Sequence, residues 1–317
     1  MSDACLSLAA SQSVPRSVLL HLAQAATRSS RAPSLAALLP AWPLPALSLS
    51  SLHTDTRLLD GQLGVEERRQ RTEAAKEVAV TLLARFQKLV LSGRSLALTT
   101  LDLTSYPLPV DHLISVLRGF SEAGSGGRRA EVTLVVDLYL TDQQCWRLNR
   151  LGQLRGGGVR VKVRHIYFSV LSHGSTYSWH TEYLEVLNKF RIAWSHIFDL
   201  SSVVGLELAR LDLRSFFAGS NTAAESNRGI GLFTFLAESF SQLTTLDLAY
   251  NAINLNGSPG TCAVLADLLS RLPHLSRLDL AGNRLTNSLP ALLAKVRRTG
   301  GGAGLDWSCF RRPTCST

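Results

Sequence analysis

The chain has 317 residues, of which 45% are hydrophobic and 18% charged, and its formal net charge at pH 7 is +9. This apolar content is enough for a large core and excludes general disorder, while the scattered basic residues, not interleaved with aromatic side chains, disfavour a nucleic-acid binder. Five cysteines without framework spacing, and no basic segment ahead of an apolar run, argue against secretion, so we expect a cytoplasmic protein, with the nucleus left open.

The first 92 residues are predicted to form a helical cap. Apolar residues recur at helical spacing over residues 18–26 and 34–39, and the proline-rich segment after Trp42 ends the second helix. A long helix is expected over residues 65–90, with Gly93 as a suitable residue after its end. The most apolar run, residues 35–49, is interrupted by prolines and is too short to span a bilayer, so no membrane partner is expected.

Strands and helices are predicted to alternate through the middle of the chain. A strand begins at Leu98 and a helix follows over residues 111–120. Residues 132–140 are rich in β-branched and aromatic side chains, which predicts a buried strand. Thr141 or Asp142 then caps a helix that reaches about residue 154, and residues 159–164 alternate as a half-exposed strand does.

The last third of the chain contains a repeated motif. Residues 243–253 read Leu-Thr-Thr-Leu-Asp-Leu-Ala-Tyr-Asn-Ala-Ile, and residues 275–285 read Leu-Ser-Arg-Leu-Asp-Leu-Ala-Gly-Asn-Arg-Leu. Both follow the pattern L-x-x-L-x-L-x-x-N-x-L, which is typical of the strand and turn of a leucine-rich repeat. In this repeat the leucines fill the core, and the Asn side chain bonds backbone groups that the turn leaves without partners. Looser copies of the leucine spacing begin at Leu98 and at Leu208.

These elements predict an α/β fold, a leucine-rich repeat solenoid in the form of a horseshoe with parallel strands inside, helices outside and an N-terminal helical cap. Helices are expected to end near residue 240, to cover residues 261–271, and to begin again at residue 288. The cap covers residues 1–92, the repeats cover residues 93–298 and are degenerate before residue 205, and residues 299–317 form a disordered tail.

Polar residues occupy the positions between the paired leucines. Because side chains of a strand alternate, these positions point away from the core onto the concave face. The acidic, Arg and Thr side chains at these positions are suited to binding a polar protein partner, because complementary charges set the specificity of such binding. The alternative is that Leu-Asp-Leu is only the usual composition of this repeat. The candidate partner-binding residues are Asp102, Arg210, Asp212, Thr245, Asp247, Arg277 and Asp279.

The sequence contains no arrangement that indicates catalysis. His173 and His180 are seven residues apart, which fits neither a helical metal site nor a zinc finger, and no nucleophile elbow or phosphate-binding loop occurs. Cys145 and Cys262 are interpreted as packing residues. We therefore expect no enzymatic activity, no cofactor and no metal.

Several segments together resemble the PRAME family. They are Pro15-Arg16, Trp42-Pro-Leu44 with its surroundings, residues 101–103, the Val-Asp-Leu core of residues 132–140, and residues 211–248. The similarity extends over roughly residues 6–298 and implies a helical cap on a horseshoe. It also implies a function, because some members of the family are substrate receptors of cullin-2 ubiquitin ligases and bind elongin B and C through a BC box in the first helix.

The BC box of this chain would lie at Leu6 and Leu8, with Gln12 at the place where the family has a small Cys or Ser. The alternative for the two leucines is simple packing within the cap. Two functions are therefore expected: substrate recognition for a cullin-2 ligase, or an inhibitory or scaffolding interaction that regulates a signalling kinase or transcription regulator without ligase attachment. In both, a protein client occupies the concave face.

Overall fold

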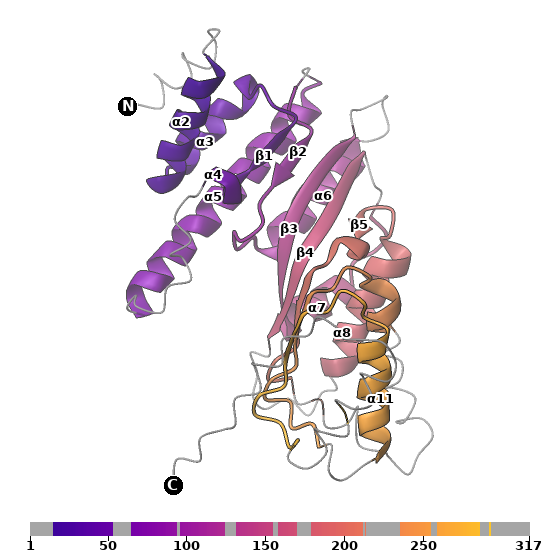
Figure 1. The fold of residues 1–317 in the computed structure, drawn as a ribbon. Helices are drawn as coiled ribbons and strands as arrows, with labels where there is room; N and C mark the ends of the chain where they lie inside the picture. The colour runs from indigo at the N-terminus through magenta and orange to yellow at the C-terminus, as the bar shows by residue number, and fades with distance from the viewer. Residues whose placement is uncertain are drawn as a thin grey trace. The chain divides into compact units, whose positions relative to one another are not determined.

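The computed structural model describes residues 15–52, 65–93, 96–123, 131–154, 158–169, 179–211, 213, 235–254, 259–285 and 292 (Figure 1). The chain divides into two compact units. Unit 1 comprises Met1–Tyr139, Gly152–Val163 and His196–Phe198, and unit 2 comprises Leu140–Leu151, Arg164–Ser195 and Asp199–Thr317.

Helices α2, α3, α5, α6 and α11 form where the sequence predicts helices. In unit 1, the short helix α3 packs against both α2 and α5, and α5 also contacts α6 (Figure 1). The bounds in unit 1 are α2 (Arg16–Arg28), α3 (Ala32–Leu38), the 3-10 turn η1 (Leu39–Ala41), α4 (Leu49–Leu52), α5 (Val65–Leu91) and α6 (Val110–Ala123). Those in unit 2 are α7 (Asp142–Asn149), α8 (Trp179–Asn188), the π-helical turn η4 (Lys189–Ala193), the 3-10 turn η5 (Leu200–Ser202) and α11 (Pro259–Ser270).

The sheet of unit 1 is built from parallel strands with their leucines in register. Strands β1 (Ala46–Ser48), β2 (Thr100–Asp102) and β3 (Val132–Thr141) are neighbours in that order. Leu47, Leu101 and Leu134 lie directly opposite one another and are all buried. The next neighbour of β3 is β4 (Val159–Ser169), which in turn pairs with the short strand β5 (Phe198–Asp199).

Strand β1 lies in a segment where the sequence analysis predicted only helices. Residues 44–49 read Leu-Pro-Ala-Leu-Ser-Leu, which is the leucine spacing of the repeat, and the indole Nε1 of Trp42 donates to the carbonyl of Ala46 at 3.0 Å. The sequence did not predict this strand, because Pro disfavours strand interiors. In the structure Pro45 precedes the strand, and its carbonyl accepts hydrogen bonds from the amides of Thr99 and Thr100.

The sheet of unit 2 has the same kind of strand pairing. The second half of β4 is followed by β6 (Gly205–Glu207), β7 (Thr245–Asp247) and β8 (Arg277–Asp279), all parallel. Leu206, Leu246 and Leu278 lie opposite one another with exposures of 2%, 0% and 1%. One short parallel strand per repeat, with its leucines buried, confirms the α/β leucine-rich repeat fold.

The strand predicted at Leu208 lies earlier in the chain than expected. Leu206 pairs with Leu246, so the repeat begins at Val203, and Leu208 takes the place of Leu248. Leu211 then stands where the complete repeats have Asn. The backbone supports this alignment, because the residue before that place has a positive φ in three successive repeats: Arg210 (60°), Tyr250 (56°) and Gly282 (68°).

The Asn side chains of the complete repeats bond the backbone of the preceding repeat, as the motif predicted. Asn251 is fully buried, its Nδ2 donates to the carbonyl of Leu208 at 2.7 Å, and its Oδ1 accepts from the amide of Leu211 at 2.7 Å. Asn283 repeats this one turn later: its Oδ1 accepts from the amides of Asn251 and Ile253, and its Nδ2 donates to the carbonyl of Leu248. These bonds couple neighbouring repeats.

Two further boundaries differ from the predictions. Helix α7 begins at Asp142 with a complete capping box between Thr141 and Gln144, but it ends at Asn149 and not near residue 154. Strand β4 extends beyond residue 164 to Ser169. Among the described helices, none is long and apolar enough to cross a membrane.

Candidate functional site

Two columns of side chains lie on the side of the unit 2 sheet away from its leucine core. They are fixed by the register of four parallel strands, since residues on either side of a buried leucine point to the opposite face. We call this surface the polar face. Its first column is His165, Gly205, Thr245 and Arg277, and its second column is Tyr167, Glu207, Asp247 and Asp279.

The acids of the second column form a row of three, Glu207, Asp247 and Asp279, which we call the carboxylate row. Two of them also end their strands: Oδ1 of Asp247 accepts from the amide of Ala249, and Oδ1 of Asp279 accepts from the amide of Ala281, each at 2.8 Å. A carboxylate that bonds an amide two residues ahead is a common turn element. The recurrent Leu-Asp-Leu therefore has a local structural role in addition to any role in binding.

Asp102 has the same local role in unit 1. Its Oδ1 accepts from the amide of Thr104, and its Oδ2 accepts from the hydroxyl of Ser48 on the neighbouring strand, both at 2.9 Å. Both oxygens of Asp102 are thus used within unit 1, which makes Asp102 a weaker candidate for partner binding than Asp247.

Two acids of the carboxylate row, Glu207 and Asp247, lie where their ionised form is disfavoured. Burial raises the pKa of Glu207 above its usual value, and the neighbouring Asp247 raises it further, while Arg210 lowers it. Burial likewise raises the pKa of Asp247, with an opposing contribution from the amide of Ala249, a further rise from Asp279, and smaller reductions from Arg277 and Arg210. Desolvation and like-charge repulsion both disfavour the ionised form.

Aromatic and basic side chains border the carboxylate row. The guanidinium carbon of Arg210 lies 5.4 Å from the centroid of the Tyr250 ring, a cation–π distance, and Tyr250 is 58% exposed. The Tyr250 ring covers Gly282, where a Cβ atom would lie 2.3 Å from a ring carbon, so this contact, together with the positive φ, favours glycine.

His165 fills the place of the side chain that Gly205 lacks. A Cβ atom at Gly205 would lie 2.4 Å from Cδ2 of His165, so the imidazole lies directly over that glycine. The rings of His165 and Tyr167 are stacked with their centroids 6.0 Å apart. The polar face therefore combines aromatic rings on β4 with acids on β6, β7 and β8.

The structure brings together most of the candidate residues that it describes. Thr245, Asp247, Arg277 and Asp279 lie side by side on β7 and β8. Arg210 lies in the turn after β6, not on the strand, and its charge acts on Glu207 and Asp247. Asp212, Leu6, Leu8, Gln12, His173 and the tail at residues 299–317 lie outside the described residues.

Sequence reasoning missed Glu207, His165 and Tyr167. The signal for Glu207 was present, because Leu206-Glu-Leu208 has the Leu-acid-Leu spacing, but the competing Leu211-Asp-Leu213 five residues later matched the motif better. His165 and Tyr167 lie on a strand without the repeat motif, and only the pairing of β4 with β6 places them on the polar face.

A comparison with known families supports the repeat. Residues 274–296 match the family model of the leucine rich repeat. The match includes β8 and Asn283, and thus one of the two complete motifs. A search of curated proteins found no match. The leucine-rich repeat is typical of protein-binding modules, and the function proposed below starts from that coarse assignment.

Within the described part of the chain, no group of three or more His, Cys, Asp or Glu residues could hold a metal ion. Cys145 is fully buried, and Cys262 is partly buried in α11. These surroundings favour the packing interpretation of both thiols.

Removal of the charge from the carboxylate row should stabilise the protein at neutral pH. A carboxyl group with a raised pKa in the folded state opposes folding above that pKa, and the cost disappears as the pH falls through the folded value to the unfolded one. We expect Glu207→Gln and Asp247→Asn each to raise the free energy of unfolding by about 0.2–1 kcal/mol at pH 7, since both groups are partly solvated. The Asn amide oxygen can still accept from Ala249.

The measurement is thermal unfolding from pH 7 down to about pH 4, the ordinary range for carboxyl groups. The gain of each variant should shrink as the pH falls. A variant less stable than the wild type at pH 7 would contradict the assigned cost of the charge.

Proposed function

We propose that the chain is a non-enzymatic binding protein whose polar face holds a protein client. The observation that carries this proposal is the register of β4, β6, β7 and β8, which aligns charged and aromatic side chains on adjacent strands over a buried leucine core. A row of rigid strands presents such groups in fixed positions, so little side-chain or backbone ordering is required on binding.

The electrostatics of the carboxylate row support a binding role. Glu207 and Asp247 keep acidic side chains in positions where burial and mutual repulsion disfavour the charge. Groups that reduce stability are commonly retained for function. Complementary charges on a client would offset this repulsion and set the specificity and rate of association.

The resemblance to the PRAME family extends the proposal to a cullin-2 ubiquitin ligase in the cytoplasm. Leu6 and Leu8, with Gln12 at the small-residue place, would contact elongin B and C, and the repeats would hold the client while a separate enzyme transfers ubiquitin. Such a receptor acts by proximity, because it raises the local concentration of the client near the transferring enzyme. The second candidate is an inhibitory or scaffolding protein without a ligase. The observation that favours it is Gln12, which stands where the BC box of the family has a small Cys or Ser.

One co-purification experiment tests both parts. The full chain would be expressed in cultured cells as wild type, as Glu207→Gln/Asp247→Asn, and as Leu8→Ala, and bound proteins would be quantified by mass spectrometry. Glu238→Gln/Asp267→Asn is a matched control, since it makes the same two chemical changes at exposed positions of unit 2. We expect the recovery of a client to fall by about 5-fold or more in the first double variant only.

A client that is recovered equally with both double variants would remove the polar face as its binding site. For the ligase, elongin B and C should accompany the wild type and be lost with Leu8→Ala. Their absence from the wild type would leave the scaffolding function as the better proposal.

A further inference from the structure

Helices α3 and α5 of unit 1 enclose a groove that the proposed function does not use. The groove has a volume of about 530 Å³. Its walls are small or aliphatic side chains that leave space between the two helices: Pro33, Ala36 and Ala37 from α3, and Val80, Thr81 and Ala84 from α5. Arg85 and Lys88 complete the lining at the C-terminal part of α5.

The lining residues of α5 form one straight stripe. Positions 80, 81, 84, 85 and 88 are separated by alternating steps of one and three, so they share one side of the helix over about 12 Å of its length. On α3 the lining positions 33, 36 and 37 have the same spacing. The small side chains on these two facing sides of α3 and α5 leave a groove between the helices. The side chains of a third helix can pack into such a groove.

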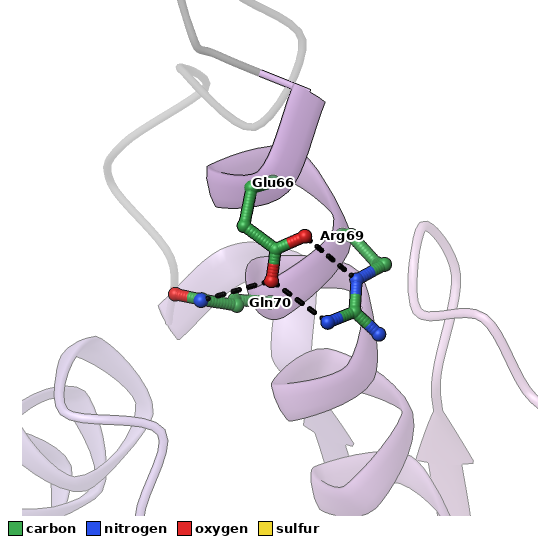
Figure 2. A network of polar contacts seen from close by, with 3 residues as sticks. All are labelled: Glu66, Arg69 and Gln70. Carbon is green, nitrogen blue, oxygen red and sulfur yellow. Dashed lines mark hydrogen bonds and ion pairs between the residues drawn. The ribbon is translucent and has the colours of Figure 1, made fainter.

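The two basic residues of the groove differ from three other cations of α5. Near the start of the helix these three pair with an acid three or four positions away: Arg69 with Glu66, Arg71 with Glu67, and Lys76 with Glu73. Figure 2 shows the first of these pairs, in which Glu66 also accepts from the amide of Gln70. The pKa of Glu66 is lowered by these contacts.

Arg85 and Lys88 have no such neighbour. The positions three and four residues from Arg85 are Thr81, Leu82, Lys88 and Leu89, and those from Lys88 are Ala84, Arg85, Leu91 and Ser92. Helix α3, which forms the other wall, contains no acidic residue. Within the described part of unit 1, neither cation makes an ion pair or a side-chain hydrogen bond, and both are exposed at the edge of an apolar groove.

We propose that this groove binds an acidic amphipathic helix of a partner protein. Small apolar side chains of the partner would enter between Ala36 and Ala84, and its Asp or Glu side chains, at the edge of the apolar stripe, would pair with Arg85 and Lys88. A helix fits better than a nucleic acid or a lipid surface, because the lining of the groove is mostly apolar and offers two cations and not an extended basic patch. This surface is separate from the polar face, so the two proposals can fail independently.

The test uses the purified full chain and a synthetic fluorescent peptide of about 18 residues, with Ala and Leu at helical spacing flanked by Glu. Binding would be measured by fluorescence anisotropy. One comparison peptide has the same composition with the apolar spacing broken, and another has Lys in place of each Glu. Vesicles with anionic lipids form the last comparison.

We expect the amphipathic acidic peptide to bind in the micromolar range and both comparison peptides to bind at least about 10-fold more weakly. Ala84→Leu, which fills the groove from a half-buried position, and Arg85→Gln/Lys88→Gln should each weaken binding by about 10-fold or more. The matched control Arg69→Gln/Arg71→Gln removes the same charge from the same helix outside the groove, and should change the affinity by less than about 2-fold.

Circular dichroism of each variant would verify that the helices are retained. The proposal is overturned if the peptide does not bind, if the peptide with broken spacing binds equally well, or if the control double variant loses as much affinity as Arg85→Gln/Lys88→Gln. Preferential binding to the vesicles that is weakened by Ala84→Leu would overturn it in favour of a membrane surface.

Discussion

Leu248→Asp should abolish cooperative folding of unit 2. Leu248 is 0% exposed and follows β7, and its backbone amide donates to the carbonyl of Asp279 on the next strand at 2.8 Å. The substitution removes roughly 1.5–3 kcal/mol of apolar burial. It also places a carboxylate without a partner among leucines, which costs several kcal/mol more or forces protonation of the group.

The combined loss is comparable with the total stability of a typical domain, about 5–15 kcal/mol. Far-ultraviolet circular dichroism and thermal unfolding would measure it. Leu248→Ala should give a smaller loss of about 2–5 kcal/mol, because it leaves a cavity without a charge. Ile192→Asp is the matched control, since Ile192 is 67% exposed on η4 and should tolerate the charge within about 0.5 kcal/mol. A cooperative transition of wild-type midpoint in Leu248→Asp would contradict the assignment of this leucine to the core.

The sequence predicts the fold best where the repeat is complete. The leucine positions of residues 243–253 and 275–285 determine both the strands and their mutual register, because a shift by one residue would expose every leucine. Leu98 and Leu101 are predicted equally well, since β2 has the same Leu-Asp-Leu core.

Prediction was weaker where the turn half of the motif is lost. In the repeat of β6, Leu211 occupies the place of Asn251, so the chain contains two overlapping series of correctly spaced leucines, and the later series matches the motif better. Hydrogen bonding to β4 and β7 and the positive φ of Arg210 distinguish the two series. Strand β1 was not predicted, although Leu44, Leu47 and Leu49 have the leucine spacing of the repeat, because the prolines on either side of Leu44 argued against a strand.

The candidate site was predictable in kind but not in composition. Asp247 and Asp279 follow directly from the motif, whereas His165 and Tyr167 join them only through pairing between strands whose sequences share no motif. The raised pKa values of Glu207 and Asp247 depend on burial by neighbouring repeats, which no spacing rule contains. Binding of a client at these residues stays a prediction.

Asn251→Ala should be nearly as damaging as the loss of a core leucine. The Asn251 side chain is fully buried and makes two bonds of 2.7 Å to the preceding repeat, from its Nδ2 to the carbonyl of Leu208 and to its Oδ1 from the amide of Leu211. After the substitution, a buried amide and a buried carbonyl lose their partners. Each unsatisfied group costs about 1–3 kcal/mol, so we expect a total loss of roughly 2–5 kcal/mol in the free energy of unfolding.

Denaturant unfolding would measure this loss, and hydrogen exchange at the Leu211 amide would localise it. Asn188→Ala is the matched control, because Asn188 is exposed at the end of α8 and its side chain makes no capping bond to η4. That variant should remain within about 0.5 kcal/mol of the wild type. If both variants were equally stable, the Asn251 side chain would add nothing to the leucine packing and the backbone hydrogen bonds that join the repeats. If only Asn251→Ala is destabilised, the Asn251 side chain contributes to the coupling between the repeats of β6 and β7. The repeat of β6 carries Leu211 at the corresponding place and cannot extend that coupling toward β4.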